Sequence, residues 1–142
     1  MRILYFHQYF SLRSGSSGTR SYEFAKRLVE RGHSVQVICA YHTGAGFRAR
    51  KRVNRFYSED LIDGISIIQI HAAYSNHDGL LKRSAIFLLS ALVGIFLALR
   101  KDYDLLFASS TPLTIALPSI AAKLLRRKAF VFEVRDLWPE LP

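Results

Sequence analysis

Blocks of apolar and polar residues follow one another along this chain in a way that predicts strands and helices in turn. Short apolar runs predict buried strands over residues 2–7, 34–41, 63–72, 103–110 and 129–134. Longer stretches with apolar residues at helical spacing predict helices over residues 19–33, 79–102 and 111–128. The segment 42–63 shows no convincing period and holds five basic residues between Arg48 and Arg55, so a long, partly mobile loop is predicted there.

This order of elements is typical of an α/β fold built on a parallel sheet. Nearly continuous apolar strands favour a sheet that is covered on both faces. Right-handed crossovers bring the carboxyl ends of such strands to one edge, and ligands bind along that edge. The loops expected there cover residues 8–18, 41–47, 71–76, 109–112 and 135–140.

Composition limits the chain to one core domain and indicates an anionic partner. Its 142 residues, half of them apolar, suffice for one hydrophobic core and hardly for two. The net charge of +9 predicts attraction to a phosphorylated ligand, a lipid surface or a nucleic acid. The single cysteine, Cys39, excludes an intrachain disulfide, and its apolar surroundings predict a buried, inert thiol in a reducing compartment. No signal peptide is predicted, so cytoplasmic residence is expected.

A glycine loop separates the first predicted strand from the first predicted helix. Gly15 and Gly18 flank two serines, and such a loop lets backbone N–H groups approach a phosphate at the positive end of a helix. The spacing Gly15-Ser-Ser-Gly18 does not match GxGxxG. It does not match GxxxxGK[ST] either, because Thr19 and Arg20 stand where that motif needs lysine and serine. A flexible connector in which Thr19 or Ser17 caps the helix remains an open alternative.

Charged residues gather after the last predicted strand, in the segment "EVRDLWPE" over residues 133–140. A charged side chain at the end of a buried strand costs free energy unless it is paired or serves in a functional site. Arg135 can bind a phosphate or carboxylate with two donors, and Asp136 can accept a proton or orient a hydroxyl group. An internal salt bridge between neighbours is the open alternative, with Trp138 and Pro139 as simple packing.

Several segments in order resemble one known family. They are "HQYF", "GSSGTRSYEFAKRLVERGHSVQVIC", "DGISIIQI", "FASSTP" and "FEVRDLWPE". Together they resemble the amino-terminal domain of the family-four retaining glycosyltransferases of bacterial exopolysaccharide and O-antigen synthesis, closest to the colanic-acid or fucosamine-type branch. The resemblance spans almost the whole chain.

The resemblance implies the amino-terminal half of a GT-B fold, a Rossmann-like parallel sheet with helices on both faces. In such an enzyme the amino-terminal domain holds the acceptor, and a carboxyl-terminal domain holds the nucleotide-sugar donor through a Glu-x₇-Glu motif, without a metal or other cofactor. Residues 1–142 contain no such motif. We therefore expect an incomplete acceptor-side domain with no donor-binding domain, its donor half missing or on a separate chain. The isolated chain should transfer no sugar.

The resemblance also implies roles for individual residues. Asp136, with Arg135, is the candidate catalytic group. Asp136 would orient the reactants rather than act as nucleophile, because the leaving diphosphate helps to deprotonate the acceptor. The candidate substrate-binding residues are Gly15, Gly18, Thr19, Arg20, His7, Ser109, Ser110 and Thr111. No metal site is predicted, since His42, His71 and His77 lack ligand spacing.

Two features bear on the partners. Residues 84–99 form sixteen uncharged, mostly apolar positions, fewer than the roughly 20 needed to cross a bilayer, so a helix buried against the sheet is expected. Alternatively, its outer face touches the inner membrane surface, where a lipid-linked or saccharide acceptor would be used. The basic segment 48–55 is a solvated loop or attracts anionic lipid or an acceptor pyrophosphate, and no nucleic-acid motif accompanies it. The alternative function is a non-catalytic basic α/β subunit that binds a membrane or a partner chain.

Overall fold

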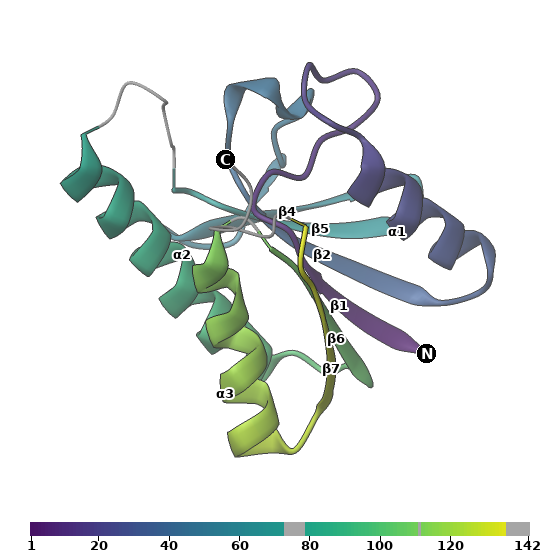
Figure 1. Ribbon diagram of the computed structural model, residues 1–142. Helices are drawn as coiled ribbons and strands as arrows, with labels where there is room; N and C mark the ends of the chain where they lie inside the picture. The colour runs from purple at the N-terminus through teal and green to yellow at the C-terminus, as the bar shows by residue number, and fades with distance from the viewer. Residues whose placement is uncertain (73–78, 111, 136–142) are drawn as a thin grey trace.

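The computed structural model describes residues 1–72, 79–110 and 112–135. Within these residues, the chain forms a seven-stranded sheet with helices on both faces (Figure 1). The elements are β1 (Arg2–Phe6), α1 (Arg20–Glu30), β2 (Ser34–Ala40), the 3₁₀ turn η1 (Thr43–Ala45), β3 (Lys51–Arg52), β4 (Tyr57–Ile62), β5 (Ile65–Ile70), α2 (Leu80–Arg100), β6 (Leu105–Ser109), η2 (Leu113–Ile115), α3 (Ala116–Arg126) and β7 (Ala129–Glu133). The strand order is β3-β4-β5-β2-β1-β6-β7, with β5, β2, β1, β6 and β7 parallel.

Alternation along the strands builds one apolar layer on each face of the sheet. Leu4 and Phe6 of β1 pack into the layer under α2 and α3, whereas Tyr5 between them packs into the layer under α1. The two helices α2 and α3 lie side by side, and α1 covers the opposite face (Figure 1). The predicted α/β, Rossmann-like fold class is confirmed. Cys39 is buried and free, as predicted, and burial raises the pKa of its thiol.

The prediction of a structureless loop over residues 42–63 is wrong, because this segment holds η1, β3 and β4. Strand β4 pairs antiparallel with β5, so that Ile62 lies opposite Ile65 across the two-residue turn Asp63-Gly64. Both turn residues have positive φ, 52° and 79°, which is the backbone of the hairpin turn that Asp-Gly favours. The sheet is consequently mixed, with an antiparallel edge.

Ion pairs accommodate the two charged residues in the middle of β4. Asp60 accepts hydrogen bonds from the Arg50 guanidinium at 3.1 and 3.2 Å, and Glu59 pairs with Lys101 Nζ at 3.0 Å. The strand is therefore stabilised by its pairing with β5 and by charged partners more than by burial of its side chains.

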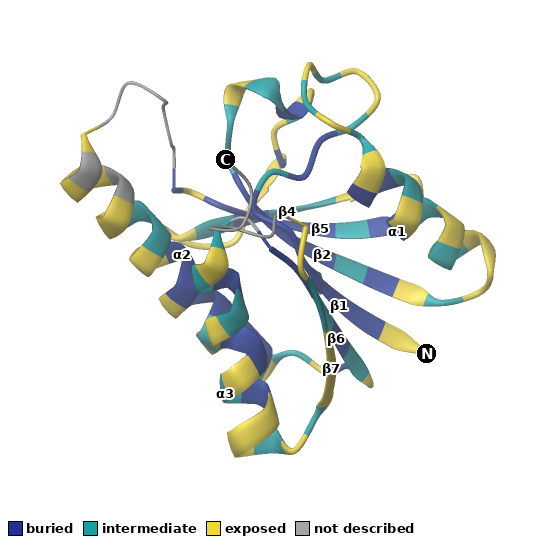
Figure 2. Cartoon of the chain, in the orientation of Figure 1, coloured by how far each residue is buried: buried dark blue, intermediate teal, exposed yellow. Residues whose placement is uncertain are grey.

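Helix α2 is buried on one face only. Ala91, Leu97 and Ala98 lie in the core, as predicted for a helix against the sheet. Leu92 and Phe96 are 55 % and 50 % exposed on the other face, and Figure 2 shows exposed residues along both α2 and α3 away from the sheet. Over the part of the chain that is described, no helix has the length and apolar character needed to cross a membrane.

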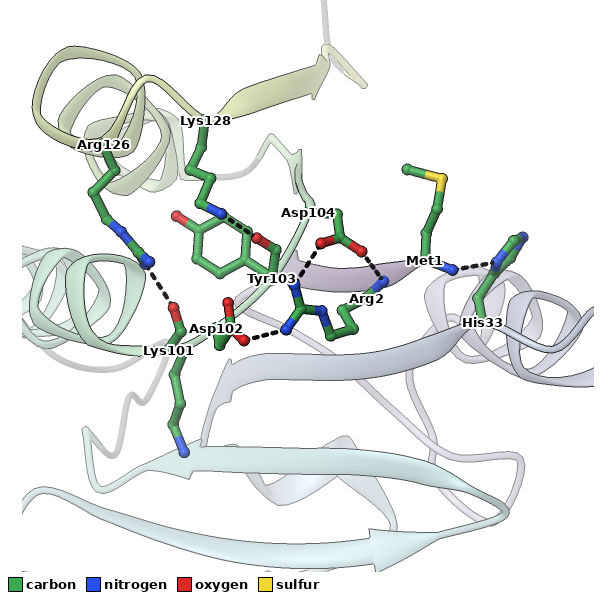
Figure 3. Close-up of polar contacts among 9 residues, drawn as sticks. All are labelled: Met1, Arg2, His33, Lys101, Asp102, Tyr103, Asp104, Arg126 and Lys128. Carbon is green, nitrogen blue, oxygen red and sulfur yellow. Dashed lines mark hydrogen bonds and ion pairs between the residues drawn. The ribbon is translucent and has the colours of Figure 1, made fainter.

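At the amino edge of the sheet, polar contacts fix the approach of α2 to β6 (Figure 3). The Arg2 guanidinium pairs with Asp102 and, at 2.7 Å, with Asp104, whose other carboxylate oxygen accepts the Arg2 backbone N–H at 2.8 Å. Arg126 donates to the Lys101 carbonyl oxygen at 2.6 Å. These contacts hold the first strand, the α2–β6 connection and the end of α3 together.

Replacing Asp104 with asparagine should lower the urea midpoint of unfolding more at pH 7 than at pH 2.5. The hydrogen bonds from the Arg2 side chain, and then from its backbone N–H, hold the pKa of Asp104 near 2, below the ordinary 3.8. The ionised carboxylate thus contributes stability above the unfolded pKa, and this contribution is lost as the pH falls toward 2. Glu30→Gln is the matched control, and a deficit of Asp104→Asn that is equal at both pH values would contradict the prediction.

Candidate functional site

Three strand ends bring predicted site residues from distant stretches of the sequence together. His7 follows β1, Ser109 ends β6 with Ser110 next to it, and Arg135 comes shortly after β7. Strand β1 is also where the strand order reverses, since β2 lies on one side of it and β6 on the other. Open α/β sheets bind ligands at the carboxyl edge beside such a reversal.

His7 is the buried centre of this cluster, with an exposed fraction of 3 %. Its Nδ1 lies 2.7 Å from Ser21 Oγ, and its Nε2 lies 3.0 Å from Arg135 Nη1. Because a guanidinium only donates, Nε2 accepts and the proton sits on Nδ1, which donates to Ser21. Burial, followed by electrostatic interactions with Arg135, His42 and Arg20, lowers the pKa of His7 from 6.5 to about 4. The ring is therefore neutral at pH 7.

Arg135 is held at its backbone and exposed at its side chain. Its backbone N–H donates to Ser110 Oγ at 2.7 Å, and one guanidinium nitrogen donates to His7. The residue is exposed, and a guanidinium has five N–H donors, so further donors remain for a planar anion such as a carboxylate or phosphate.

Glu133 ties the first helix to the last strand. One carboxylate oxygen accepts a hydrogen bond from Ser109 Oγ at 2.6 Å, and the other pairs with the Arg20 guanidinium. The carbonyl oxygen of Glu133 accepts the Ser110 backbone N–H at 2.8 Å. Arg20, the first residue of α1, is thus placed at the site by a partner on β7.

The glycine loop packs against the loop that follows β2. A Cβ atom on Gly15 would lie 2.4 Å from the carbonyl oxygen of Gly44. The Gly15 N–H donates to the Leu12 carbonyl at 2.9 Å, and the Ser16 N–H donates to the Gly44 carbonyl at 3.1 Å. These two N–H groups already have partners, which gives Gly15 a packing role. Substrate binding by Gly15 stays a prediction.

Gly18 and Thr19 lie at the open end of the same loop. A Cβ atom on Gly18 would have nothing within 4 Å. Thr19 occupies the N-cap position of α1 but makes no side-chain capping hydrogen bond, so the interpretation of Thr19 as a hydroxyl cap is wrong. Because this helix start has no side-chain cap, its first N–H groups are suited to an anion.

Two predicted site residues, Asp136 and Thr111, lie outside the described residues. The catalytic role of Asp136 with Arg135 and the binding roles of the other candidates stay predictions. Within residues 1–72, 79–110 and 112–135, no three His, Cys, Asp or Glu side chains gather in a way that could hold a metal ion.

Ser21 and Glu133 are polar partners that the sequence analysis did not single out as site residues. Ser21 is buried in the first turn of α1, where no motif marks it. Glu133 belongs to the charged segment at the end of a predicted strand, but its partner Arg20 is 113 positions away. Only the order of the strands in the sheet reveals this pair. A salt bridge between neighbouring charges was the open alternative for the segment "EVRDLWPE". Its described residues Glu133 and Arg135 instead pair with Arg20, Ser109, Ser110 and His7.

The arrangement is suited to binding an anion rather than to nucleophilic attack. Arg135 offers donors that are oriented by Ser110 and His7, and the start of α1 lies within the same loop system. A neutral, buried imidazole fixes the guanidinium without adding charge. Such a site can hold a phosphate or carboxylate close to the carboxyl edge of the sheet.

Comparison with known proteins shows what this fold is similar to. No protein-family model and no curated protein matches the sequence. The structure is similar to the catalytic domain of starch synthase IV from Arabidopsis thaliana bound to ADP and acarbose, with a TM-score of 0.65 and 14% identity, covering 92% of this chain and 33% of that one. It is also similar to trehalose-6-phosphate synthase from E. coli bound with UDP-2-fluoro glucose, with a TM-score of 0.50 and 8% identity, covering 93% and 32%.

This chain shares its Rossmann-like α/β fold with these two structures. At these identities the likeness is one of fold, and the chain spans about a third of the length of the structures it matches. The cluster of His7, Ser110 and Arg135 lies at the edge of the sheet where Rossmann-like domains bind their ligands.

Proposed function

We propose that this chain is the acceptor-side, amino-terminal domain of a retaining family-four glycosyltransferase. The enzyme would transfer a sugar from a nucleotide-sugar donor to a lipid-linked or saccharide acceptor in cell-surface polysaccharide synthesis. The observation that carries the proposal is the cluster of Arg135, His7 and Ser110 at the carboxyl edge of a GT-B-like sheet. The sequence resemblance supports the same assignment.

The proposed roles follow from chemistry and position. Arg135 binds a charged group of donor or acceptor, and His7 with Ser110 positions it. Gly18 and the start of α1 face the donor diphosphate, where open backbone N–H groups can donate. Asp136 orients the acceptor hydroxyl group at the transferring sugar. A carboxyl-terminal donor domain supplies the nucleotide site, so residues 1–142 by themselves stay inactive. The enzyme works in the cytoplasm, at the inner membrane face, and needs no metal.

Transfer should therefore require a donor domain. The chain is assayed alone and mixed with a donor-domain chain from the same source, using a panel of nucleotide sugars and a membrane lipid extract. We expect transfer in the mixture only, its loss in Asp136→Ala, and at least a tenfold decrease in Arg135→Gln, corresponding to about 1.4 kcal/mol of lost transition-state stabilisation. Arg31→Gln, at the far end of α1, is the matched control and should retain full activity.

Two outcomes would overturn parts of this proposal. Sugar transfer by the isolated chain would contradict the proposed requirement for a donor domain. If the mixture transfers no sugar although both chains are folded, the proposed transferase function is contradicted. The competing proposal of a non-catalytic binding subunit is then favoured. The net charge of +9 and the exposed apolar face of α2 are the features that a membrane-binding subunit would use.

A further inference from the structure

A basic pocket lies near the carboxyl end of β5, on the face of the sheet that α1 covers. Gln69 forms part of its wall and continues the alternation of Ile65 and Ile67, which pack under α1. Ser58 of β4 lies opposite Gln69, and Arg52 of β3 lies opposite Ser58, so these side chains share that face. The pocket has a volume of about 530 Å³, and the arginines that line it are Arg48, Arg50, Arg52 and Arg55.

The pocket is separate from the cluster of His7, Ser110 and Arg135. Strand β2 lies between β5, which carries Gln69, and β1, which leads to His7. None of the described residues that line the pocket belongs to that cluster. A ligand of the pocket is therefore held by side chains that have no role in the proposed transfer site.

Uncompensated positive charge lines the pocket. Arg50 is paired with the carboxylate of Asp60, whereas the other three arginines have no carboxylate partner among the described residues. Arg48 and Arg55 lie over aromatic rings, and Arg52 donates to a backbone carbonyl oxygen. These contacts orient the guanidinium groups without neutralising them. Guanidinium groups bind carboxylate and phosphate oxygens with paired donors, so the pocket is suited to an acidic group.

A buried amide in the pocket wall supplies a neutral donor. Gln69 is only 2 % exposed, and its Oε1 accepts the Ala49 backbone N–H at 2.9 Å. Its Nε2 is buried and has no hydrogen-bond partner within the described ranges. Because buried polar groups are nearly always hydrogen-bonded, a ligand oxygen at this wall would complete the amide.

Ser58 supplies a neutral acceptor in the same wall. His71 Nδ1 lies 3.2 Å from the Arg55 carbonyl oxygen, which only accepts, so Nδ1 carries a proton. In the neutral ring Nε2 then accepts from the Ser58 hydroxyl group, whose Oγ lies 2.7 Å away. Ser58 Oγ keeps its lone pairs for a donor in the pocket. An ionised carboxylate or phosphate has acceptors only, whereas a hydroxyl group both donates and accepts.

We propose that this pocket binds a saccharide that carries an acidic group, either a carboxylate or a phosphate ester. The acidic group lies among Arg48, Arg52 and Arg55, and hydroxyl groups of the sugar meet Gln69 and Ser58. The volume falls in the range of small-molecule sites, roughly 300–1,000 Å³, and leaves room for a sugar ring beside the acidic group. The assignment of this saccharide as the acceptor rests on the proposed function, whereas its binding does not.

Calorimetric titration of four probes into the chain separates the parts of this proposal. The probes are galacturonate, galactose 6-phosphate, galactose and inorganic phosphate. At least one acidic sugar should bind tenfold or more tightly than both galactose and inorganic phosphate, and the tighter one identifies the acidic group as carboxylate or phosphate. Inorganic phosphate that binds as tightly would remove the saccharide from the proposal, and galactose that binds as tightly would remove the arginines. Either result, or no binding of any probe, overturns it.

Charge variants locate the acidic group. Arg52→Gln combined with Arg55→Gln should weaken binding of the tighter acidic sugar at least tenfold, and both side chains are exposed, so the fold should tolerate the change. Arg31→Gln combined with Arg127→Gln removes the same charge from exposed positions elsewhere and should leave binding unchanged. Equal weakening in the two double variants would mean that net charge alone attracts the sugar, and the proposal fails.

Ser58→Ala tests recognition of the sugar itself. It should weaken binding of the tighter acidic sugar at least threefold and leave that of inorganic phosphate unchanged, with an unaltered urea midpoint as the check on folding. An equal decrease for phosphate would contradict sugar recognition at this wall. These assays do not depend on sugar transfer. Binding of the acidic sugar without transfer in the mixture would contradict the proposed function alone, and transfer without such binding would contradict this inference alone.

Discussion

The free energy of unfolding should fall by about 3 kcal/mol between pH 7 and pH 4 through His7 alone. Burial and the facing charges keep the pKa of His7 near 4 in the folded protein, whereas the unfolded chain has the ordinary value of 6.5. As the pH falls below 6.5, the unfolded state takes up a proton at His7 and the folded state does not. The unfolded state is thereby favoured, and the loss accumulates until the pH reaches the folded pKa.

Urea unfolding at half-unit steps from pH 7 to pH 4 measures this loss. His7→Gln should make the pH dependence shallower by about 3 kcal/mol over this range, whatever its own cost at pH 7. His33→Gln, in the turn after α1, is the matched control and should keep the slope of the unmodified chain. Acidic groups with lowered pKa values, such as Asp60 and Glu23, act in all three proteins and cancel in the comparison. An unchanged slope in His7→Gln would mean that the ring is solvated or is already charged at pH 7.

The gathering of His7, Ser110 and Arg135 could be predicted without coordinates, because it follows from topology. Each residue comes at the carboxyl end of an apolar run that is too short for anything but a strand. Once those strands are parallel, their ends meet at one edge regardless of the residues between them. The fold class therefore determines that these three residues lie together. That class can be predicted from the order of apolar runs along the sequence alone.

Other features of the site depend on pairing partners that no local pattern reveals. The placement of Arg20 by Glu133 needs the order of β1, β6 and β7 across the sheet. Strand β4 was missed because its polar residues are satisfied by charged partners from other elements, so its apolar periodicity is absent. An Asp-Gly pair such as Asp63-Gly64 is typical of a hairpin turn, and a hairpin at this position predicts β4 before it.

For helix α2 the sequence predicts the helix but not its buried face, because a helix that is apolar on all sides does not indicate which side packs against the sheet. Leu97 is buried and Phe96, beside it, is half-exposed. Their side chains differ little in polarity, so only the packing of α3 and the sheet decides the exposed face. That face forms one wall of an apolar groove whose other wall contains Phe56 and Tyr57. Membrane contact by this helix stays a prediction.

Replacing Gly15 with alanine should lower the free energy of unfolding by about 2 kcal/mol, whereas Gly18→Ala should change it by less than about 0.5 kcal/mol. The Cβ atom added at Gly15 would lie 2.4 Å from one backbone oxygen and 2.8 Å from the next. The two loops are closely packed here, because a Cβ atom on Gly46, which has a φ of +75°, would in turn lie 2.4 Å from the backbone nitrogen of Gly15. Urea unfolding of both variants at pH 7 measures the difference.

The same pair of variants separates packing from ligand binding in the glycine loop. Gly18→Ala leaves the fold intact but places a methyl group at the open start of α1, so it should weaken binding of the donor diphosphate in the mixture with a donor domain. Gly15→Ala acts through stability, and its effect on binding should disappear under conditions where the variant is fully folded. Equal loss of stability in both variants would show that the loop adjusts as one unit. Unchanged donor binding in Gly18→Ala would remove this loop from the site, because this substitution alters the open start of α1 while leaving the contact between the two loops untouched.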